Sequence, residues 1–466
     1  MRGLSPSFSV LDTLSGERVE FVAPRELKMY VCGLTVYDYA HVGHARTILT
    51  FDVLHRMALR KGFTVKYLQN FTDVDDKIID RASREGVEPQ ELAERFIAEA
   101  IRDFQLLNVR MPTLMPRATQ HVGAMHRIIE GLIGKGHAYV TPSGVYFSVR
   151  TFKDYGKLSK RRVDQLIAGA RVEPDPYKRD PVDFALWKVY EGGPLWDSPW
   201  GKGRPGWHIE CSAMIYEHLG ETIDIHGGGA DLIFPHHENE IAQSESYTGK
   251  PLARAWMHVG LLNIRSEKMA KSLGNVVRIR DAVAAWGPNT LRTYLLSSHY
   301  RSPLEFSEEG LRKANENWRI IESAAYDLLE EPPSGDRPSD EASQLLEEFD
   351  EALSSDLDTS GAISALIRLS RLIGRLRSSR ALRGSSRDLG DAFWTMFDVL
   401  GYRLPPGPPP DDVMRLVEER ARLRAEGRFS EADAIREELR SRGYELVDLP
   451  DRTVVRIVER PRASSF

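Results

Sequence analysis

The side chains best suited to metal chemistry in this sequence are two cysteines and a short run of histidine and glutamate. Cys32 and Cys211 are the only cysteines of the chain, and lone thiols of this kind are often simply buried apolar groups. In the run HHENE, His236 and Glu240 are four residues apart, so both would lie on one face of a helix. Together with the two thiols they offer the sulfur, nitrogen and oxygen donors that suit a tetrahedral zinc ion. Spacing alone does not choose between His236 and His237, and the alternative is a helix N-terminus with surface side chains.

Two short motifs could contact phosphate groups. HVGH, with His41, Gly43 and His44, follows a predicted strand and begins a predicted helix. A helix N-terminus presents unpaired N–H groups and the positive end of the helix dipole, and Gly43 would let a flat ring approach the backbone. KMAKS places Lys268 and Lys271 three residues apart in a loop that could close on a polyphosphate. The alternatives are an ordinary first helical turn and a solvated basic loop.

Glycines form two further motifs. In DIHGGG, the consecutive residues Gly227, Gly228 and Gly229 follow a predicted strand and leave the backbone open to a ligand, unless they form only a flexible turn. GKGRPG matches the glycine pattern of dinucleotide-binding proteins, which requires a strand before it and a helix after it. It contains Pro205 and precedes the run WHIECSAM, which we interpret as strand-like, so we reject a dinucleotide site there.

A strand–helix–strand unit near the N-terminus would position several of these residues. Residues 27–32 and 63–70 have strand-like composition, and between them apolar residues recur at helical spacing over 44–60. This order predicts a βαβ unit in a parallel sheet, and such sheets bind ligands at the carboxyl ends of their strands. Cys32 and the turn TDVDD, which begins at Thr72, would both lie at such ends.

The rest of the chain divides by composition. Residues 112–199 predict an α+β insertion, after which the nucleotide-fold pattern resumes near Gly206. From about Ser307 the pattern is mainly helical, and the proline run PPGPPP at 405–410 predicts a stiff linker. Beyond the linker we expect a compact tail made of a helical pair and a hairpin.

Composition indicates a soluble, globular chain of several domains. The chain has 466 residues, of which 41% are hydrophobic and 28% charged, and its net charge is −5. The N-terminus lacks the apolar segment of a signal peptide, and no run reaches the length of a membrane span. We therefore expect a cytoplasmic protein without membrane contact, in which the reducing cytosol keeps both cysteines as thiols.

The negative net charge does not favour nucleic-acid binding, but one segment is strongly basic. Residues 360–388 contain seven arginines and one acid, a local balance of +6. The arginines are Arg368, Arg371, Arg375, Arg377, Arg380, Arg383 and Arg387. Such a stripe could contact RNA phosphates, or it could be a solvated helix face.

The motifs become specific when they are taken together. HVGH and KMAKS resemble the HIGH and KMSKS signatures of class I aminoacyl-tRNA synthetases, with Val42 in place of isoleucine and Ala270 in place of serine. The blocks MYVCGLTVYDYAHVGHAR, FTDVDDKII, GRPGWHIECSAM, DIHGGGADLIFPHHENEIAQ and EKMAKSLGN resemble those of the cysteinyl-tRNA synthetases, in the same order. The resemblance continues through the helical region to the tail, so it covers essentially the whole chain. Neither substitution in the signatures is expected to abolish activity.

The resemblance implies an α/β fold. It consists of a Rossmann-like class I synthetase catalytic domain with an α+β insertion, followed by a helical bundle and a small C-terminal anticodon-binding domain. We expect the two halves of the catalytic domain at 1–111 and 200–265, separated by the connective insertion at 112–199. A stem-contact segment with the KMAKS loop would follow at 266–310, the bundle at 311–404, and the linker with the anticodon-binding domain at 405–466.

The resemblance also implies a reaction: ATP-dependent ligation of cysteine to cysteine tRNA through a cysteinyl-adenylate, by a monomer that uses Mg²⁺ with ATP. One zinc ion per chain would select the cysteine thiolate, and the implied ligands are Cys32, Cys211, His236 and Glu240. The implied catalytic residues are His41, His44, Lys268 and Lys271, and these bind ATP together with Gly43, Gly227, Gly228 and Gly229. Thr72 and Trp207 would contact the substrate cysteine.

Two other functions stay open. A ligase that joins cysteine to an amino-sugar, as in mycothiol synthesis, would share the zinc and ATP motifs, but its relatives lack a tail of the kind expected at 405–466. A non-enzymatic tRNA-binding paralogue would not need intact HVGH, KMAKS and metal ligands.

Overall fold

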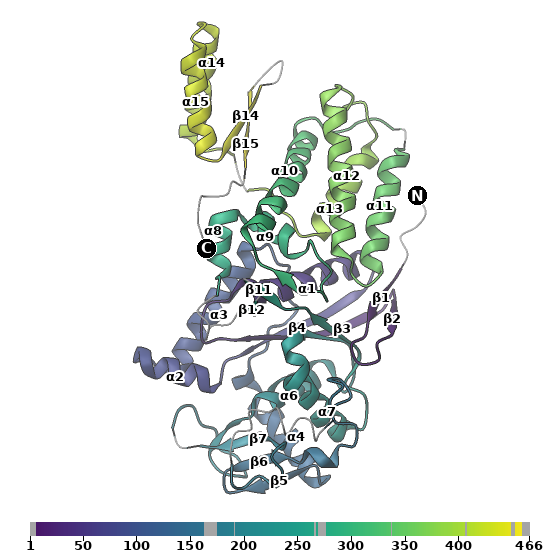
Figure 1. Cartoon of the computed structure of the whole chain (residues 1–466), viewed down its shortest axis with the longest axis vertical. Helices are drawn as coiled ribbons and strands as arrows, with labels where there is room; N and C mark the ends of the chain where they lie inside the picture. Colours follow the sequence, from purple (N-terminus) through teal and green to yellow (C-terminus); the bar gives the residue numbers. More distant parts are fainter. Residues whose placement is uncertain are drawn as a thin grey trace.

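Figure 1 shows three regions along the long axis of the molecule: a lower region built on sheets, a helical region above it, and a small domain at the top. The computed structural model describes residues 6–162, 175–190, 192–264, 276–336, 338–405, 408–448 and 453–458, and the backbone of Glu267 and Lys268. Within these ranges, no helix is both long and apolar enough to cross a membrane.

A four-stranded parallel sheet forms the centre of the lower region. Its strands are hydrogen-bonded in the order β10, β9, β3, β4, and all three neighbouring pairs are parallel. They are β3 (Glu26–Thr35), β4 (Thr64–Thr72), β9 (Ile223–Gly229) and β10 (Ala253–Val259). The chain passes from β3 to β4 on one side and later returns as β9 on the other side of β3. This reversal makes a topological switch point beside β3, the place where sheets of this kind bind ligands.

Helices cover both faces of this sheet, which explains its nearly continuous apolar strands. The helix α1 (Val42–Arg60) connects β3 to β4, so the predicted βαβ unit is confirmed. The helices α2 (Asp76–Glu85) and α3 (Pro89–Leu106) follow β4, and a hairpin of β1 (Ser7–Leu11) and β2 (Arg18–Val22) precedes β3. α1 buries most of its side chains, which fixes the position of its N-terminal HVGH turn.

The predicted α+β insertion is present and has its own apolar core. Its helical part is η1 (Ala118–His121) and α4 (Val122–Gly134). Its antiparallel sheet contains β5 (Ala138–Thr141), β6 (Gly144–Phe147), β7 (Phe184–Val189) and β8 (Gly203–Pro205). Because β8 belongs to this sheet, the insertion extends several residues beyond the predicted boundary at residue 199. The buried residues of α4, β6 and β7 pack together in one cluster.

The run WHIECSAM begins a helix, so the strand-like interpretation of this run was wrong. In α6 (Trp207–Leu219) every side chain from Ile209 to Ile215 is buried. A segment buried on all sides shows neither strand alternation nor a polar helix face, so its pattern does not distinguish the two structures. A helix therefore does follow GKGRPG, but the second half of that motif is itself the antiparallel strand β8 rather than a turn after a parallel strand. A dinucleotide site at GKGRPG is therefore still rejected, now because the motif does not follow a parallel strand.

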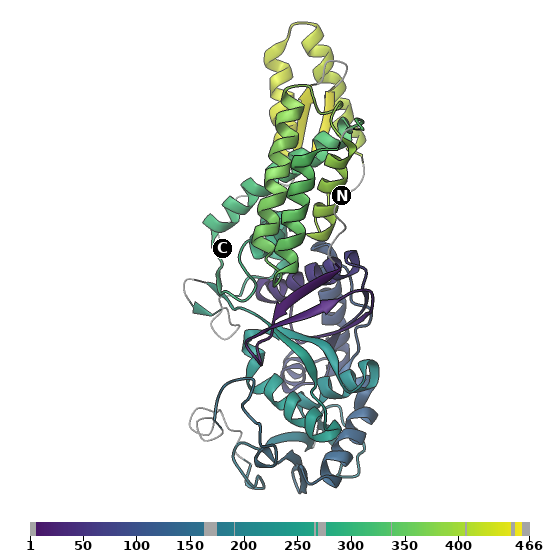
Figure 2. The same cartoon turned by 90° about the vertical axis from the view of Figure 1, so that its right-hand side faces the viewer.

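The helical region follows the parallel sheet directly. Its first part consists of β11 (Leu262–Ile264), β12 (Glu267–Lys268), α8 (Ile279–Trp286), α9 (Pro288–Leu295) and β13 (Leu304–Glu305). The bundle consists of α10 (Glu308–Glu330), α11 (Asp340–Ser354), α12 (Thr359–Ser378) and α13 (Arg387–Val399). Figures 1 and 2 show the bundle helices stacked side by side above the sheets. Each bundle helix is preceded by an N-cap serine or aspartate whose side chain accepts a hydrogen bond from a backbone N–H of the first helical turn.

The arginine-rich segment does not form a free basic stripe. Arg368 and Arg375 pair with glutamates of α11, and Arg377 pairs with three acids at the end of α10. Arg387 lies 4.0 Å from the carboxylate of Asp336. The predicted local charge of +6 is thus partly compensated in space, because acids from other segments of the chain pair with four of the seven arginines.

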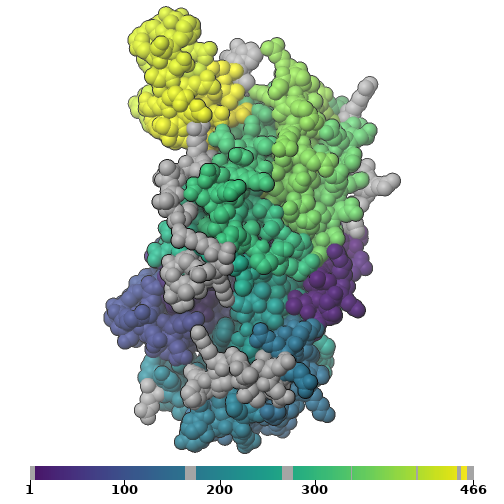
Figure 3. Space-filling view, in the orientation of Figure 1, coloured from purple at the N-terminus to yellow at the C-terminus, as the bar shows by residue number. Residues whose placement is uncertain are grey.

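The tail forms a separate small domain. It contains α14 (Asp411–Ala425), α15 (Phe429–Ser441), β14 (Tyr444–Asp448) and β15 (Thr453–Ile457), which confirms the predicted helical pair and hairpin. Its apolar core is distinct from that of the bundle. Figure 3 shows it as a yellow lobe against the helical region. Arg456 joins the two, since its guanidinium is 2.7 Å from a carboxylate oxygen of Asp327 and 2.6 Å from one of Glu330 on α10.

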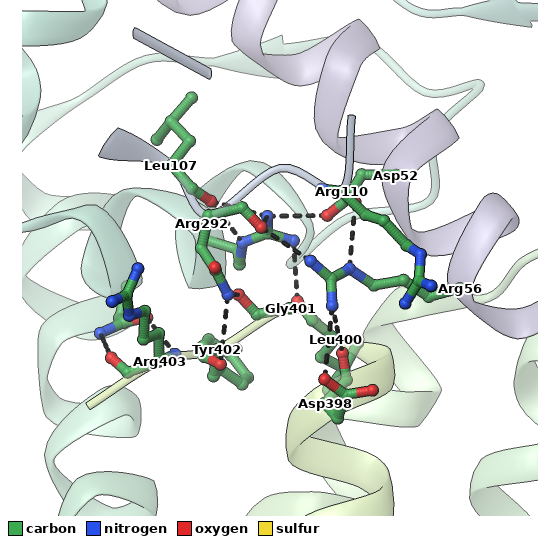
Figure 4. Close-up of polar contacts among 12 residues, drawn as sticks. Asp52, Arg56, Leu107, Arg110, Arg292, Asp398, Leu400, Gly401, Tyr402 and Arg403 are labelled. Carbon is green, nitrogen blue, oxygen red and sulfur yellow. Dashed lines mark hydrogen bonds and ion pairs between the residues drawn. The ribbon is translucent and has the colours of Figure 1, made fainter. Parts of the chain in front are cut away.

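A buried ionic cluster joins α1 to the helical region (Figure 4). Arg292 of α9 is 1% exposed, and its guanidinium lies 2.8 Å from a carboxylate oxygen of Asp52 on α1. The same guanidinium donates to the backbone carbonyls of Leu107 and Leu400. Arg56, one turn after Asp52, donates to the second oxygen of that carboxylate at 3.0 Å. This buried cluster therefore connects α1 and α9 to the backbone at the ends of α3 and α13.

Arg292→Met should destabilise the whole chain. The change leaves Asp52 with one cationic partner fewer in a buried setting, and loss of a partner from a buried ion pair costs about 3–5 kcal/mol. Arg387→Met is the matched control, because that side chain is 68% exposed and its partner Asp336 is 94% exposed. The midpoint of thermal unfolding should fall by several degrees for Arg292→Met and stay unchanged for the control. Equal midpoints for the two variants would contradict a structural role of the cluster.

Candidate active site

The four predicted metal ligands meet at the switch point of the parallel sheet. Cys32 lies on β3, Cys211 on α6, His236 in the turn before α7 (Glu238–Thr248), and Glu240 in the first turn of α7. One ligand atom from each comes within 4.8 Å of those of the others, and all four residues are buried. His236 and Glu240 were predicted to share one helix, but α7 begins at Glu238, and His236 lies in the short irregular turn before it.

The distances in this cluster fit a tetrahedral zinc ion. Two bonds of about 2.3 Å to sulfur at the tetrahedral angle place the sulfurs about 3.8 Å apart. The sulfur atoms of Cys32 and Cys211 are 3.8 Å apart. One carboxylate oxygen of Glu240, Oε1, lies 3.4 Å from the sulfur of Cys32 and 2.9 Å from Nε2 of His236. The donor set and its spacing therefore fit zinc with little rearrangement.

Two further histidines contact the cluster: His237, which the sequence left open as an alternative to His236, and His226, which was not identified from the sequence. Nε2 of His226 lies 2.8 Å from the other carboxylate oxygen of Glu240, and Nε2 of His237 lies 3.3 Å from the sulfur of Cys32. These two residues with Cys32 and Glu240 make a second possible ligand set. We favour the first set, because Oε1 of Glu240 faces both Cys32 and His236, whereas His226 and His237 orient ligands from outside. His226 belongs to the DIHGGG motif, in which only the glycines were predicted to contact a ligand.

Charge is concentrated on the predicted ligands. Burial alone would raise the pKa of Glu240, but the charges and hydrogen bonds of His226 and His236 hold it well below its usual range. Burial alone would lower the pKa of His236, but Glu240 and then Cys211 raise it to about 10. The hydrogen bond with Cys32 lowers the pKa of the Cys211 thiol to about 6, whereas burial raises that of Cys32 well above its usual value. Thiolate and carboxylate are thus available to a cation.

Trp207 contacts this cluster directly, and Thr72 lies near it through Glu210. Trp207, at the start of α6, stacks on the ring of His236 with centroids 4.4 Å apart, and it remains 39% exposed. Thr72 is the last residue of β4 and accepts a hydrogen bond from the Asn70 side chain. Its neighbour Glu210 is buried, and burial raises the pKa of that carboxyl well above its usual value.

The HVGH turn is well ordered around its two histidines. His41 caps α1, and each of His41 and His44 accepts the backbone N–H of the other through Nδ1, at 3.3 Å. The two rings stack with centroids 3.6 Å apart. A side chain at Gly43 would meet the His41 ring at 3.0 Å, so the glycine keeps this stacked arrangement possible.

The segment after the KMAKS loop pairs with HVGH. Val42 donates to the carbonyl of Val277 at 3.0 Å, and Ile279 donates to the carbonyl of Ala40 at 3.1 Å. Lys268 lies in β12, opposite Asn263 of β11. Lys271, together with Ala270, lies outside the described residues. The described segment that follows the KMAKS loop therefore lies beside the HVGH turn.

The glycines of DIHGGG are part of β9 rather than a turn after it, which corrects the predicted position. They pair with Met257, His258 and Val259 of β10. A side chain at Gly227 would meet the ring of Phe51 at 2.1 Å, so this glycine permits close packing of α1 on the sheet. Gly229 ends the strand and is partly exposed.

Comparison with known proteins agrees with this geometry. Residues 18–316 match the family of class I (C) tRNA synthetase catalytic domains. A cysteine–tRNA ligase of Caldicellulosiruptor saccharolyticus is 45% identical over 454 residues, covering 95% of this chain and 98% of the relative. One of Thermococcus gammatolerans is 44% identical over 468 residues, covering 96% and 98%.

A solved structure supports the fold. Mycobacterium tuberculosis methionyl-tRNA synthetase in complex with methionyl-adenylate has a TM-score of 0.59 and 17% identity, covering 81% of this chain and 90% of that one. At such low identity, this likeness bears on the fold alone. The family match and the high coverage of the relatives carry the assignment: the chain belongs to the cysteine–tRNA ligase family of class I tRNA synthetases.

Proposed function

We propose that this enzyme joins cysteine to cysteine tRNA in two steps at the switch point of the parallel sheet. The carboxylate of cysteine attacks the α-phosphate of ATP, giving cysteinyl-adenylate and pyrophosphate. A ribose hydroxyl at the end of the tRNA then attacks the acyl carbon, and AMP leaves. The observation that carries the proposal is the buried Cys32, Cys211, His236 and Glu240 cluster in a chain of this family.

The cluster would act on the cysteine side chain. Zinc held by these four residues would favour the sulfur of cysteine over the hydroxyl of serine and lower the pKa of the thiol. His226 and His237 would keep Glu240 and Cys32 oriented through the contacts described above. Trp207, stacked on His236 and partly exposed, would form a wall of the side-chain pocket, and Thr72 would lie on the amino-group side.

The HVGH and KMAKS motifs would act on ATP, whose phosphates would also carry Mg²⁺. His41 and His44 at the N-terminus of α1 would stabilise charge on the reacting phosphate, aided by the helix dipole. Lys268 and Lys271 would approach it from the loop whose flanking residues pair with HVGH. Gly43 and the glycines Gly227, Gly228 and Gly229 would let the nucleotide approach the backbone.

The tail domain would bind the anticodon end of the tRNA. It has a core of its own and projects beyond the bundle, far from the parallel sheet (Figure 1). The arginine-rich segment would contribute less than its sequence suggests, because acids of α10 and α11 pair with several of its side chains. We therefore propose that residues 405–466 provide the specific recognition of the tRNA.

Zinc content should distinguish the two possible ligand sets. His236→Asn should lose bound zinc and cysteine-dependent pyrophosphate exchange together, because His236 belongs to the favoured set. His237→Asn is the matched control, since it changes the adjacent buried histidine and should retain about one zinc per chain. Elemental analysis and exchange assays on both purified variants check this. Zinc retained by His236→Asn and lost by His237→Asn would show that the second ligand set holds the metal.

Removal of the tail should separate the two half-reactions. A chain ending at Leu404 keeps every catalytic motif, so cysteine-dependent pyrophosphate exchange should persist. Charging of cysteine tRNA should fall steeply, because binding energy at the anticodon end is lost. A chain ending at Val458 keeps both tail helices and the hairpin and should charge normally.

Three outcomes would contradict parts of this assignment. Unchanged charging by the shorter chain, once circular dichroism shows that it is folded, would exclude a selective role of the tail. A full-length chain that charges no tRNA but ligates cysteine to an amino-sugar would support the alternative ligase. A chain that binds tRNA but catalyses neither half-reaction would be a non-enzymatic paralogue.

A further inference from the structure

A second cluster of metal-binding side chains lies at the junction of the insertion and α6. Nε2 of His121, at the end of η1, is 2.7 Å from Nε2 of His218 near the end of α6. A carboxylate oxygen of Glu217 lies within 4.8 Å of a ring nitrogen of each histidine. His218 follows Cys211 by seven residues on one helix, a rise of about 10 Å, so this cluster is separate from the active site.

The ring of His121 is held in the form that binds metals. Its Nδ1 lies 2.6 Å from the carbonyl oxygen of Arg117, and a carbonyl only accepts hydrogen bonds. Nδ1 therefore carries the proton, and Nε2 presents its lone pair toward His218. A backbone carbonyl that fixes the tautomer in this way is the usual partner of a metal-bound histidine.

The second histidine is equally well positioned. The Nζ of Lys66 on β4 donates to the backbone carbonyl of His218 at 2.5 Å and so fixes the end of α6. Burial first, and then the neighbouring His121, lowers the pKa of His218, which favours the neutral ring. Glu217 pairs with Arg127 at 3.1 Å, but these side chains are 41% and 62% exposed, so the pair is weak enough to exchange for a metal.

We propose that His121, His218 and Glu217 bind a divalent transition-metal ion such as zinc, apart from the catalytic site. Two imidazole nitrogens and one carboxylate oxygen suit zinc, with water in the fourth position. Binding would displace the proton that lies between the two Nε2 atoms; solvent would take it up and supply one to Nδ1 of His218, so that both rings stay neutral. The two Nε2 atoms would then separate to about 3.3 Å. The ion would join the start of α4 to the end of α6, the helix that carries Trp207 and Cys211 (Figure 1). Its role would be to stabilise this junction.

The test is zinc binding by the full-length chain. Equilibrium dialysis against increasing free Zn²⁺ should show a second bound equivalent beyond the catalytic one, and the midpoint of thermal unfolding should rise with zinc but not with Mg²⁺. His218→Gln should weaken the second equivalent at least about tenfold and abolish the zinc-dependent rise. It should leave the first equivalent and cysteine-dependent pyrophosphate exchange unchanged.

His137→Gln is the matched control, because His137 is a half-buried histidine of the same insertion that contacts Thr151. The His137→Gln variant should still bind the second equivalent of zinc. The proposal is wrong if the wild-type chain binds a single zinc and shows no zinc-dependent rise. It is also wrong if both histidine variants lose the second equivalent alike. The stoichiometry of the wild-type chain decides the question even if His218→Gln does not fold.

Discussion

The carboxylate of Glu240 has no exposure to solvent, and the way its charge is compensated determines what the site can bind. An ionised carboxylate buried without partners would cost several kcal/mol, so it must be paired or bind a cation. Its two oxygens face different partners: His226 on one side, and His236 with Cys32 on the other. The first contact fixes the orientation of the carboxylate, and the second turns an oxygen toward both sulfur and imidazole. A soft divalent cation satisfies this arrangement better than a proton does.

The fold supplies this arrangement from three distant segments. The switch point beside β3 brings Cys32 next to β9, which carries His226, while α6 and α7 add Cys211 and Glu240. The same strand, β9, packs closely against α1 because Gly227 has no side chain to hold it away from Phe51. The position of HVGH at the start of α1 and the position of the sulfur ligands therefore depend on one another. This gives a physical reason why the proposed nucleotide and thiol sites would share one sheet edge.

Much of this could be predicted from the sequence, because the elements concerned have clear patterns. The βαβ unit, the bundle and the tail all show regular periodicity and ordinary start and stop residues. The four residues that meet in the buried cluster were predicted as metal ligands from their chemistry and from the resemblance of whole blocks. Prediction failed where burial removes the pattern, as in α6, and where glycines stand inside a strand, as in β9. Residues 209–215 of α6 and 223–228 of β9 are buried without interruption, so neither run has an exposed face to mark its structure.

Other features depend on partners that are remote in the chain. The sequence of α12 is strongly basic because acids that pair with its arginines lie on other helices, α10 and α11. The contact between His121 and His218 spans 97 residues and leaves no local signal. His226 and His237 likewise gain meaning only beside Glu240 and Cys32. Sequence spacing predicts neighbours along one element, whereas these contacts arise from the way separate elements pack.

The selection of cysteine by sulfur can be measured as the ratio of kcat/KM for cysteine-dependent to serine-dependent pyrophosphate exchange. Shape alone distinguishes side chains that differ by one group only roughly 10–200-fold. With zinc bound by Cys32, Cys211, His236 and Glu240, the ratio for the full-length chain should lie far above that range. A ratio within it would mean that the cluster does not select the substrate by its thiolate.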